Sequence, residues 1–395
     1  MSSSATTSTI NAPAMVRFSY LPLTLLCLGH FFIDLYSSAL GAFQPLLVAK
    51  HHLRLAEAGL LGGALVFSSS LAQPLYGYLS DRYRSKLFSC LAPAVAGIFI
   101  SALGAASSFS ALLFAVLLGG MGIASFHPQG SAWATIGIEE NRARWFAVFI
   151  SSGTLGFALG PTFFSFFLPR IGLENSLWLA IPGILISVFL MITLEPPSFE
   201  GVKQHKFDLE PLRKVKRTLL LLYLLVFVRS IVQVTYAQLL PLYLTKERGF
   251  TFTEATATLS LYLAAGALGG FIGGSLADRW GGRKVILVSM ACCVPPLALF
   301  FLTSGWISIV SLALAGLILL FTIPVNVVMA QQLAPTQAGT ISALMMGFAW
   351  GLAGLIFIPF TGWMGDHYSL GIAMAFLAAF PILGALFAWM LPKEL

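Results

Sequence analysis

Charged side chains are scarce in this chain. Asp, Glu, Lys and Arg make up 9% of its 395 residues, whereas soluble globular domains carry about 25%. Hydrophobic residues make up 58% of the sequence. This composition excludes an ordinary soluble domain and predicts a chain that crosses a membrane several times.

The usual signatures of catalysis are also missing. The chain has no Gly-Lys dipeptide, which excludes the ATP-binding Walker A loop, and it has neither a His-Glu-x-x-His motif nor a nucleophile elbow. Its four cysteines lie in apolar stretches without a Cys-x-x-Cys pair. His51 and His52 lack carboxylates at metal-ligand spacing. We therefore expect no enzyme activity, no cofactor and no metal site.

Long apolar runs are what the sequence does contain. A bilayer core of about 30 Å requires about 20 apolar residues in a helix. The runs predict an all-α membrane protein with twelve transmembrane helices, at residues 18–47, 56–79, 87–107, 110–136, 145–168, 176–194, 218–244, 254–276, 284–303, 306–330, 339–364 and 369–391. Residues 1–17 lack the basic segment of a signal peptide, so we expect a disordered cytoplasmic leader there.

The basic residues are unevenly distributed between the predicted loops. If the N-terminus is cytoplasmic, sixteen of the 22 Lys and Arg residues lie on the cytoplasmic side, five lie outside, and Arg229 remains within the membrane. This asymmetry follows the positive-inside rule and predicts an inner (plasma) membrane protein with both termini in the cytoplasm. It explains the net charge of +7 without a nucleic-acid partner.

The chain divides into two halves. The polar stretch 195–217 predicts a cytoplasmic linker between six-helix bundles at 18–194 and 218–395. GYLSDRYRSK (77–86), after the second helix, recurs as GSLADRWGGRK (274–284), after the eighth. Parallel six-helix repeats of this kind predict a transporter in which one bundle rocks against the other around a central site.

Prolines repeat at matching places in the two halves. Pro45 near the end of the first helix corresponds to Pro241 in the seventh, and Pro128 in the fourth corresponds to Pro324 in the tenth. The repeat therefore extends through the membrane helices and is not confined to the loops.

The two Gly-x-Leu-x-Asp-Arg loops resemble the signature loop of the major facilitator superfamily. Within it, the chain resembles the fosmidomycin resistance protein group in four features: the spacing of His30 and Asp34, LAQPLYGYLSD (71–81), GMGIASFHPQG (120–130) and GDHYS (365–369). The resemblance implies export of an antibiotic of phosphonate type. It also implies that the loops form a cytoplasmic latch that holds the outward-facing state, although they could serve only to set the topology. The implied latch residues are Gly77, Asp81, Arg82, Gly274, Asp278, Arg279 and Arg283.

The fifth predicted helix carries GTLGFALGPTFF (153–164). Gly156, Gly160 and Pro161 resemble a Gly-x-x-x-Gly-Pro pattern of drug–proton antiporters in the superfamily. Small residues four apart allow close helix contact, and a proline bends a helix. Close packing alone is the alternative explanation.

Ionisable groups within the predicted helices indicate a transport pathway, because burying a charge in the bilayer costs about 2.5–3.5 kcal/mol on insertion scales. Asp34 lies near the middle of the first helix, with His30 one turn before it on the same face. Desolvation and a nearby cation have opposite effects on the proton affinity of a carboxyl group. We predict that Asp34 binds the coupling proton and that His30 relays it.

Arg229 lies near the middle of the seventh helix, where Gln233 and Tyr236 extend its face. Alignment of the two halves places it one residue from the counterpart of Asp34, so both are predicted to face one central cavity. A guanidinium group offers forked donors to a phosphonate or carboxylate, which predicts anion binding. The alternative is a structural salt bridge between Asp34 and Arg229, although the cost of burying two charges opposes it.

His127 precedes Pro128 in the fourth helix, where a broken hydrogen-bond ladder could expose carbonyls to the cavity. The resemblance implies a substrate or coupling role, but a locally bonded histidine is equally compatible. The family pattern would place Glu after His-Pro, whereas this chain has Gln129.

Asn326 is the matching polar group in the tenth helix and a further predicted substrate contact. Asp366 and His367 are interpreted as a helix-end cap, with gating as the alternative.

These features predict a secondary active transporter that works by alternating access, a proton-coupled exporter of small amphipathic or anionic compounds such as antibiotics. The expected partners are a small-molecule substrate, protons and the lipid bilayer, and the chain is expected to act as a monomer. Proton-coupled uptake of an organic anion or metabolite would use the same residues in the opposite direction. A passive channel and a membrane enzyme or receptor are further alternatives from other classes.

Overall fold

The computed structural model describes residues 20–83, 85–136, 138, 142–196 and 210–393. Within these ranges the regular structure is entirely helical, and twelve helices are long and apolar enough to cross a membrane. The all-α, twelve-helix prediction is therefore confirmed. The predicted leader and most of the predicted linker lie outside the described residues.

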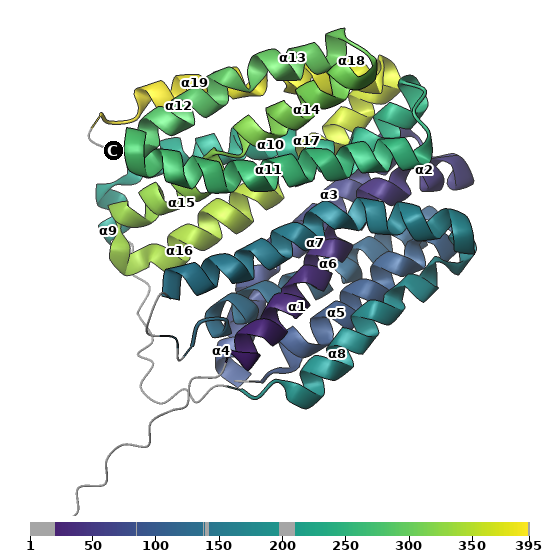
Figure 1. Ribbon diagram of the computed structural model, residues 1–395, viewed down its shortest axis with the longest axis horizontal. Coiled ribbons are helices and arrows are strands. Elements are labelled where there is room, and N and C mark those ends of the chain that lie inside the picture. The colour runs from purple at the N-terminus through teal and green to yellow at the C-terminus, as the bar shows by residue number, and fades with distance from the viewer. Residues whose placement is uncertain (1–19, 84, 137, 139–141, 197–209, 394–395) are drawn as a thin grey trace, which may run out of the picture.

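The helices up to Thr193 form the N-terminal bundle, drawn in purple to teal in Figure 1. They are α1 (Leu21–Ser37), α2 (Ala39–His51), α3 (Leu55–Leu71), α4 (Gln73–Tyr83), α5 (Leu87–Ser101), η1 (Ala102–Ala105), α6 (Phe109–Trp133), α7 (Arg142–Ile171), η2 (Leu173–Ala180) and α8 (Ile181–Thr193). The first predicted span is thus two helices, α1 and α2, which meet at Ser38.

The C-terminal bundle, green to yellow, lies above it in the same view (Figure 1). After the short α9 (Glu210–Lys214), it contains α10 (Lys216–Glu247), α11 (Phe252–Trp280), α12 (Gly282–Cys292), α13 (Val294–Leu302), α14 (Gly305–Leu319), α15 (Thr322–Leu333), η3 (Pro335–Gln337), α16 (Ala338–Ser342), the π-helical η4 (Ala343–Phe348), α17 (Ala349–His367), α18 (Leu370–Leu377) and α19 (Phe380–Met390).

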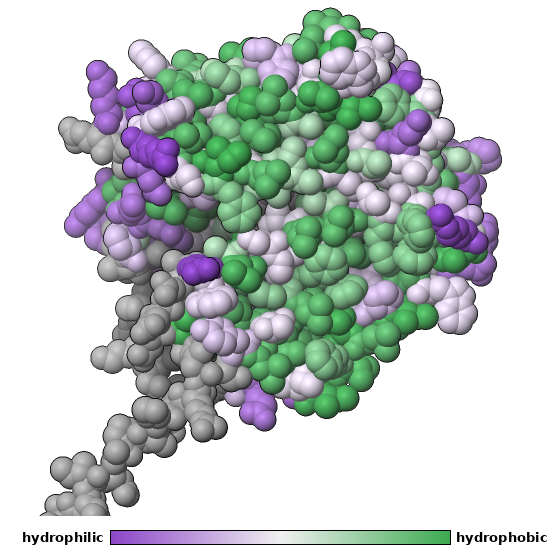
Figure 2. Space-filling model, viewed as in Figure 1, coloured by the Kyte–Doolittle hydropathy of each residue, from purple (hydrophilic) through white to green (hydrophobic). Residues whose placement is uncertain are grey.

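The outer surface matches a bilayer. Figure 2 shows hydrophobic side chains across the middle of the molecule, between two ends where hydrophilic side chains gather. Large apolar side chains of the candidate membrane spans are exposed, including Leu185, Leu302 and Trp306, which are 62%, 82% and 74% exposed. Such a surface would aggregate in water and is stable against lipid. The chain is a multi-pass membrane protein.

The sequence repeat has a structural counterpart in each bundle. A Cβ atom added to Gly77 would lie 3.6 Å from the Cβ of Pro128, and one added to Gly274 would lie 3.8 Å from the Cγ of Pro324. The signature glycines therefore contact the repeated prolines in the same way. In each half this contact joins the second membrane helix to the fourth.

The bundles contact each other closely in the half of the molecule that holds the turn at 52–54. A Cβ atom on Gly41 would overlap the carbonyl oxygen of Ala237, and one on Gly59 would lie 2.6 Å from that of Ile358. Thr162 donates to the hydroxyl of Ser260 at 2.7 Å. Glycines here allow backbones of the two bundles to touch. We call this half the closed end.

Asp366 provides a further link at the closed end. Its Oδ1 accepts from the backbone N–H of Leu55 at 2.7 Å, and its Oδ2 accepts from that of Ala56 at 2.9 Å. Those N–H groups belong to the first turn of α3, which has no intrahelical partners for them. Asp366, at the end of α17, thus caps a helix of the other bundle. The predicted cap exists, but it also joins the two bundles.

We expect Asp366→Ala to open the closed end more often, because separation of the bundles must break both bonds. Loss of a helix cap of this kind corresponds to about a fivefold change in an equilibrium. The measurement is the rate at which an impermeant maleimide labels Gln238→Cys, which faces Gly62 at this end, in a background without other cysteines. His367→Ala is the control, because the hydrogen bond and the ring contact of His367 within the described residues are with Trp363 of its own helix. An unchanged labelling rate in Asp366→Ala would contradict the link.

Candidate functional site

Three ionisable side chains meet inside the N-terminal bundle. The Oδ2 atom of Asp34 lies 3.4 Å from the Nε2 of His30, and its Oδ1 lies 3.6 Å from the Nε2 of His127. His30 and Asp34 are one turn apart on α1, whereas His127 comes from α6. The side chains are 6%, 18% and 25% exposed for His30, Asp34 and His127. We call this group the His–Asp–His triad.

The ring of His30 is held in place from two sides. Its Nδ1 lies 2.8 Å from the backbone oxygen of Phe149 on α7. The Phe149 ring stacks on it at a centroid distance of 4.3 Å, and Phe126 stacks at 5.8 Å. A carbonyl oxygen only accepts, so Nδ1 carries a proton.

This hydrogen bond has an electrostatic consequence at Asp34. In a neutral imidazole with its proton on Nδ1, the Nε2 atom is an acceptor. It would then present a lone pair to a carboxylate oxygen, which also only accepts. The arrangement is attractive only when a cation lies between them or on the ring. The triad therefore places two ring nitrogens beside one carboxylate, where a shared proton or another cation can lie between them.

Gly153 of α7 completes the surroundings of the triad and was not among the predicted site residues. A Cβ atom there would overlap the Nε2 of His30 and lie 2.6 Å from the Oδ2 of Asp34. Only glycine leaves room for both side chains. The spacing of Gly153 from Gly156 and Gly160 places all three on one face of α7, which is the signal that could have identified it.

The predicted packing glycines lie further along this face. A Cβ atom on Gly156 would overlap the backbone oxygen of Phe31, and one on Gly160 would overlap the hydroxyl of Ser38. Pro161 follows within the same continuous α7. These contacts bring α7 against α1, so the close packing positions both the backbone oxygen that holds His30 and the space that Asp34 fills.

Arg229 lies in the C-terminal bundle and is 4% exposed. Its Nη1 donates to the Oε1 of Gln233 on the same helix, and its guanidinium carbon lies 5.7 Å from the centre of the Trp350 ring. Its Nε has no hydrogen-bond partner among the described residues. The ion pairs of Asp34 within the described chain are with His30 and His127, so the structure does not join Asp34 to Arg229.

Other buried polar groups of this bundle differ in their bonding. The hydroxyl of Tyr236 donates to the backbone oxygen of Met374 at 3.0 Å, which makes this predicted substrate contact a structural bond here. Asn326 is fully buried, yet neither its Oδ1 nor its Nδ2 is bonded within the described chain. The hydroxyl of Tyr262 is also unbonded there. Unbonded buried polar groups are costly and often mark binding sites.

Gln129 occupies the position where the family pattern would place Glu. Its Oε1 accepts from the N–H and hydroxyl of Ser89 at 3.0 and 2.7 Å. Its Nε2 donates to the hydroxyl of Ser80 and the backbone oxygen of Ser85, both at 2.9 Å. The amide therefore joins α4, α5 and the loop between them. It turns away from the triad into a network that uses both of its donor hydrogens, which an ionised Glu would not supply.

The predicted latch residues lie at the end of the molecule opposite the closed end. The Nη1 of Arg82 donates to the hydroxyl of Tyr78 at 2.9 Å, and the Nη2 of Arg283 donates to the backbone oxygen of Trp389 at 2.7 Å. Both contacts stay within one bundle. Asp278 and Arg279 are exposed, and the side chain of Asp81 lies outside the described residues. The latch remains a prediction.

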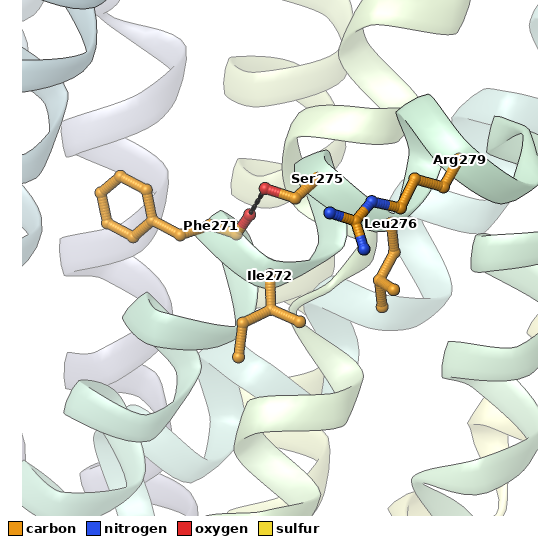
Figure 3. A pocket seen from close by; sticks show the side chains of 5 residues that line it. All are labelled: Phe271, Ile272, Ser275, Leu276 and Arg279. Atoms are coloured by element: carbon orange, nitrogen blue, oxygen red, sulfur yellow. Dashed lines mark hydrogen bonds between the residues drawn. The ribbon is translucent and has the colours of Figure 1, made fainter.

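Two surface hollows lie away from the triad and from Arg229. The one in Figure 3 measures about 280 Å³ and is lined by α11 residues from Phe271 to Arg279, with the hydroxyl of Ser275 donating to the backbone oxygen of Phe271 at 3.2 Å. The other, about 660 Å³, lies between α4, α5 and α6. Neither is lined by a triad residue or by Arg229, and both have mainly apolar walls, so we do not place the ion or substrate site in them.

The two-bundle arrangement with intramembrane charges is that of a membrane transporter. The family model for the Major Facilitator Superfamily matches residues 26–357 and 222–394, and the chain belongs to this superfamily. The prediction made from the signature loops is confirmed.

Individual relatives agree with this assignment. The chain is 28% identical to the fosmidomycin resistance protein of Escherichia coli (strain K12), over 94% of this chain and 92% of that protein. It is also 28% identical to an uncharacterised MFS-type transporter of Bacillus subtilis (strain 168), over 98% and 96%. A crystal structure of a bacterial homologue of the human lysosomal transporter Spinster, inward-facing and occupied, superposes with a TM-score of 0.79 at 18% identity, over 93% and 95%.

Proposed function

We propose that this transporter is a proton-coupled exporter of small amphipathic or anionic compounds. The observation that carries the proposal is the Asp34 carboxylate held between the imidazoles of His30 and His127. Three groups that exchange protons, two of them partly exposed, provide a site that can load and release a proton within the membrane. The similarity to a fosmidomycin resistance protein supports the outward direction and an antibiotic substrate.

Alternating access supplies the rest of the cycle. With the predicted topology, the turn at 52–54 lies outside, so the closed end faces the periplasm and the opposite end faces the cytoplasm. Substrate would enter from the cytoplasm in this state. After the protein has switched to the outward-facing state and released the substrate, a proton that binds the triad from the outer side would favour return to the state described here. Each chain holds both bundles, so we propose that a monomer is sufficient.

Proteoliposomes with purified protein test this proposal. With an imposed pH difference and fosmidomycin as the probe compound, we expect accumulation against its concentration gradient on the more acidic side. Collapse of the pH difference by a protonophore should stop accumulation. Downhill movement at a rate that ignores the pH difference, with no accumulation, would show a passive channel. Accumulation on the alkaline side would show coupled uptake in the opposite sense.

Arg229 is the proposed contact for the anionic part of the substrate. It is a buried cation without a carboxylate partner in the described chain, and an anion would compensate its charge. We expect Arg229→Ala to weaken binding of anionic compounds at least about tenfold, the value of one charge-assisted hydrogen bond, and to leave neutral compounds nearly unaffected. Arg229→Lys should give an intermediate loss because it keeps the charge and loses the fork.

The measurement for Arg229 is the ligand-induced rise in unfolding temperature of the purified protein, compared between matched anionic and neutral compounds. Equal losses for both kinds of compound would remove the anion contact. Gln233→Ala tests whether the hydrogen bond that orients the guanidinium matters, and we expect a smaller loss in the same direction.

A further inference from the structure

The triad has the composition and spacing of a transition-metal site. We propose that His30, Asp34 and His127 bind one divalent transition-metal ion, such as Zn²⁺ or Co²⁺, at the place where a proton also binds. One ligand atom from each residue lies within 4.8 Å of the others. The sequence predicts no metal site because the ligands come from two helices, with His127 far along the chain from the other two. This proposal names the ion that the triad binds. It does not depend on whether transport is coupled to protons.

The distances support a metal ion. Zinc bonds of about 2.0–2.1 Å to nitrogen and oxygen in a tetrahedral site place two ligand atoms about 3.3–3.4 Å apart. The Oδ2 atom of Asp34 lies 3.4 Å from the Nε2 of His30, and its Oδ1 lies 3.6 Å from the Nε2 of His127. Each separation is longer than a strong charge-assisted hydrogen bond of about 2.7–2.9 Å and close to that of two ligand atoms on one ion. Because the two distances end on different oxygens, an ion shared by all three residues would lie against both oxygens of the carboxylate.

The orientation of the His30 ring independently supports a metal ion at the triad. A metal-bound histidine normally donates its second ring N–H to a carbonyl or carboxylate, which aims the other nitrogen at the ion. The bond from His30 Nδ1 to the backbone oxygen of Phe149 at 2.8 Å does this and directs Nε2 toward Asp34. Two imidazoles and one carboxylate suit zinc, cobalt and nickel rather than magnesium or calcium, which prefer oxygen ligands.

The exposure and the charge of the triad also suit a metal ion. Asp34 and His127 are 18% and 25% exposed, whereas His30 is nearly buried and is fixed by its bond to Phe149. The ion would compensate the carboxylate and use the lone pair of His30. The residues of α7 next to the triad, Phe149 and Gly153, do not titrate. Among the described residues named here, metal binding therefore competes with protons at His30, Asp34 and His127.

The test is Co²⁺ binding to the full-length protein in detergent, purified with an affinity tag that contains no histidine. We expect one Co²⁺ per chain, with visible absorption bands of a four- or five-coordinate site that Zn²⁺ displaces. Asp34→Asn and His127→Gln should each weaken binding at least about 100-fold, because loss of a direct ligand exceeds the 10- to 100-fold cost of removing its outer partners. His367→Ala, which removes an exposed histidine of α17, should bind normally.

Other outcomes would overturn the assignment. Unchanged stoichiometry in both triad variants, loss only in His367→Ala, or absence of saturable binding to folded wild-type protein would each do so. Lower pH should weaken binding, because the ligands must be deprotonated; binding that is independent of pH would also count against it. Metal binding without pH-driven transport would refute the proposed function and leave the site intact, whereas coupled transport without metal binding would refute only the site.

Discussion

Asp34→Asn should abolish accumulation of substrate driven by a pH difference, to the level of vesicles without protein, while substrate binding remains measurable. Asparagine has nearly the same shape as aspartate but cannot bind a proton or carry the charge. Its amide can donate to the Nε2 of His30, which lies 3.4 Å from the present carboxylate, so the packing around α1 should survive. The change thus separates the chemistry of the triad from its structure.

The measurement for Asp34→Asn pairs uptake into proteoliposomes with thermal unfolding in the presence of the compound. Glu254→Gln is a matched control, since Glu254 is an exposed acid that caps the first turn of α11 through Thr251. We expect the control to transport normally. Full accumulation in Asp34→Asn would exclude Asp34 as the proton site. Loss of both transport and compound binding would instead assign Asp34 to the substrate contact.

Gly153→Ala should reduce coupled transport about 5- to 150-fold, even though the substitution adds one methyl group. The new Cβ would overlap the Nε2 of His30 and lie 2.6 Å from the Oδ2 of Asp34, so at least one of the two side chains must move. Overpacking of this kind costs about 1–3 kcal/mol. Here the strain falls on the contact that we propose carries the proton.

Gly270→Ala is the control for this prediction. Gly270 is also a glycine within a membrane helix, but its nearest neighbour to an added Cβ is the backbone oxygen of Leu320 at 4.0 Å, so the methyl group fits. Both variants are compared for transport and for unfolding temperature. Equal transport in Gly153→Ala and wild type would show that the triad tolerates displacement. Equal losses in both variants would indicate a general effect of helix glycines.

The number, length and order of the membrane helices could be predicted because their physical causes are local. The bilayer thickness determines how long each apolar run must be, and the length of each run can be read directly from the sequence. The repeat of the signature loops and prolines predicts two similar bundles. His30 and Asp34 could be paired from sequence alone, because residues four apart on a helix share a face.

The tertiary structure decided which residues those faces meet. A helical pattern shows that Asp34 points toward the protein interior, but it does not show which neighbouring helix supplies the partner. Contact with α6 and α7 brings His127 and Gly153 to the triad, whereas Arg229, predicted to face Asp34, bonds within its own bundle. In the same way, Asp366 caps α3 rather than its own segment.

The sequence alone therefore determined the twelve apolar helices, their repeat and the charged residues within them. Only the packing of helices distant in the chain decided which of these charges share a site, because such contacts depend on side-chain shape across two surfaces and leave no periodic pattern in either one.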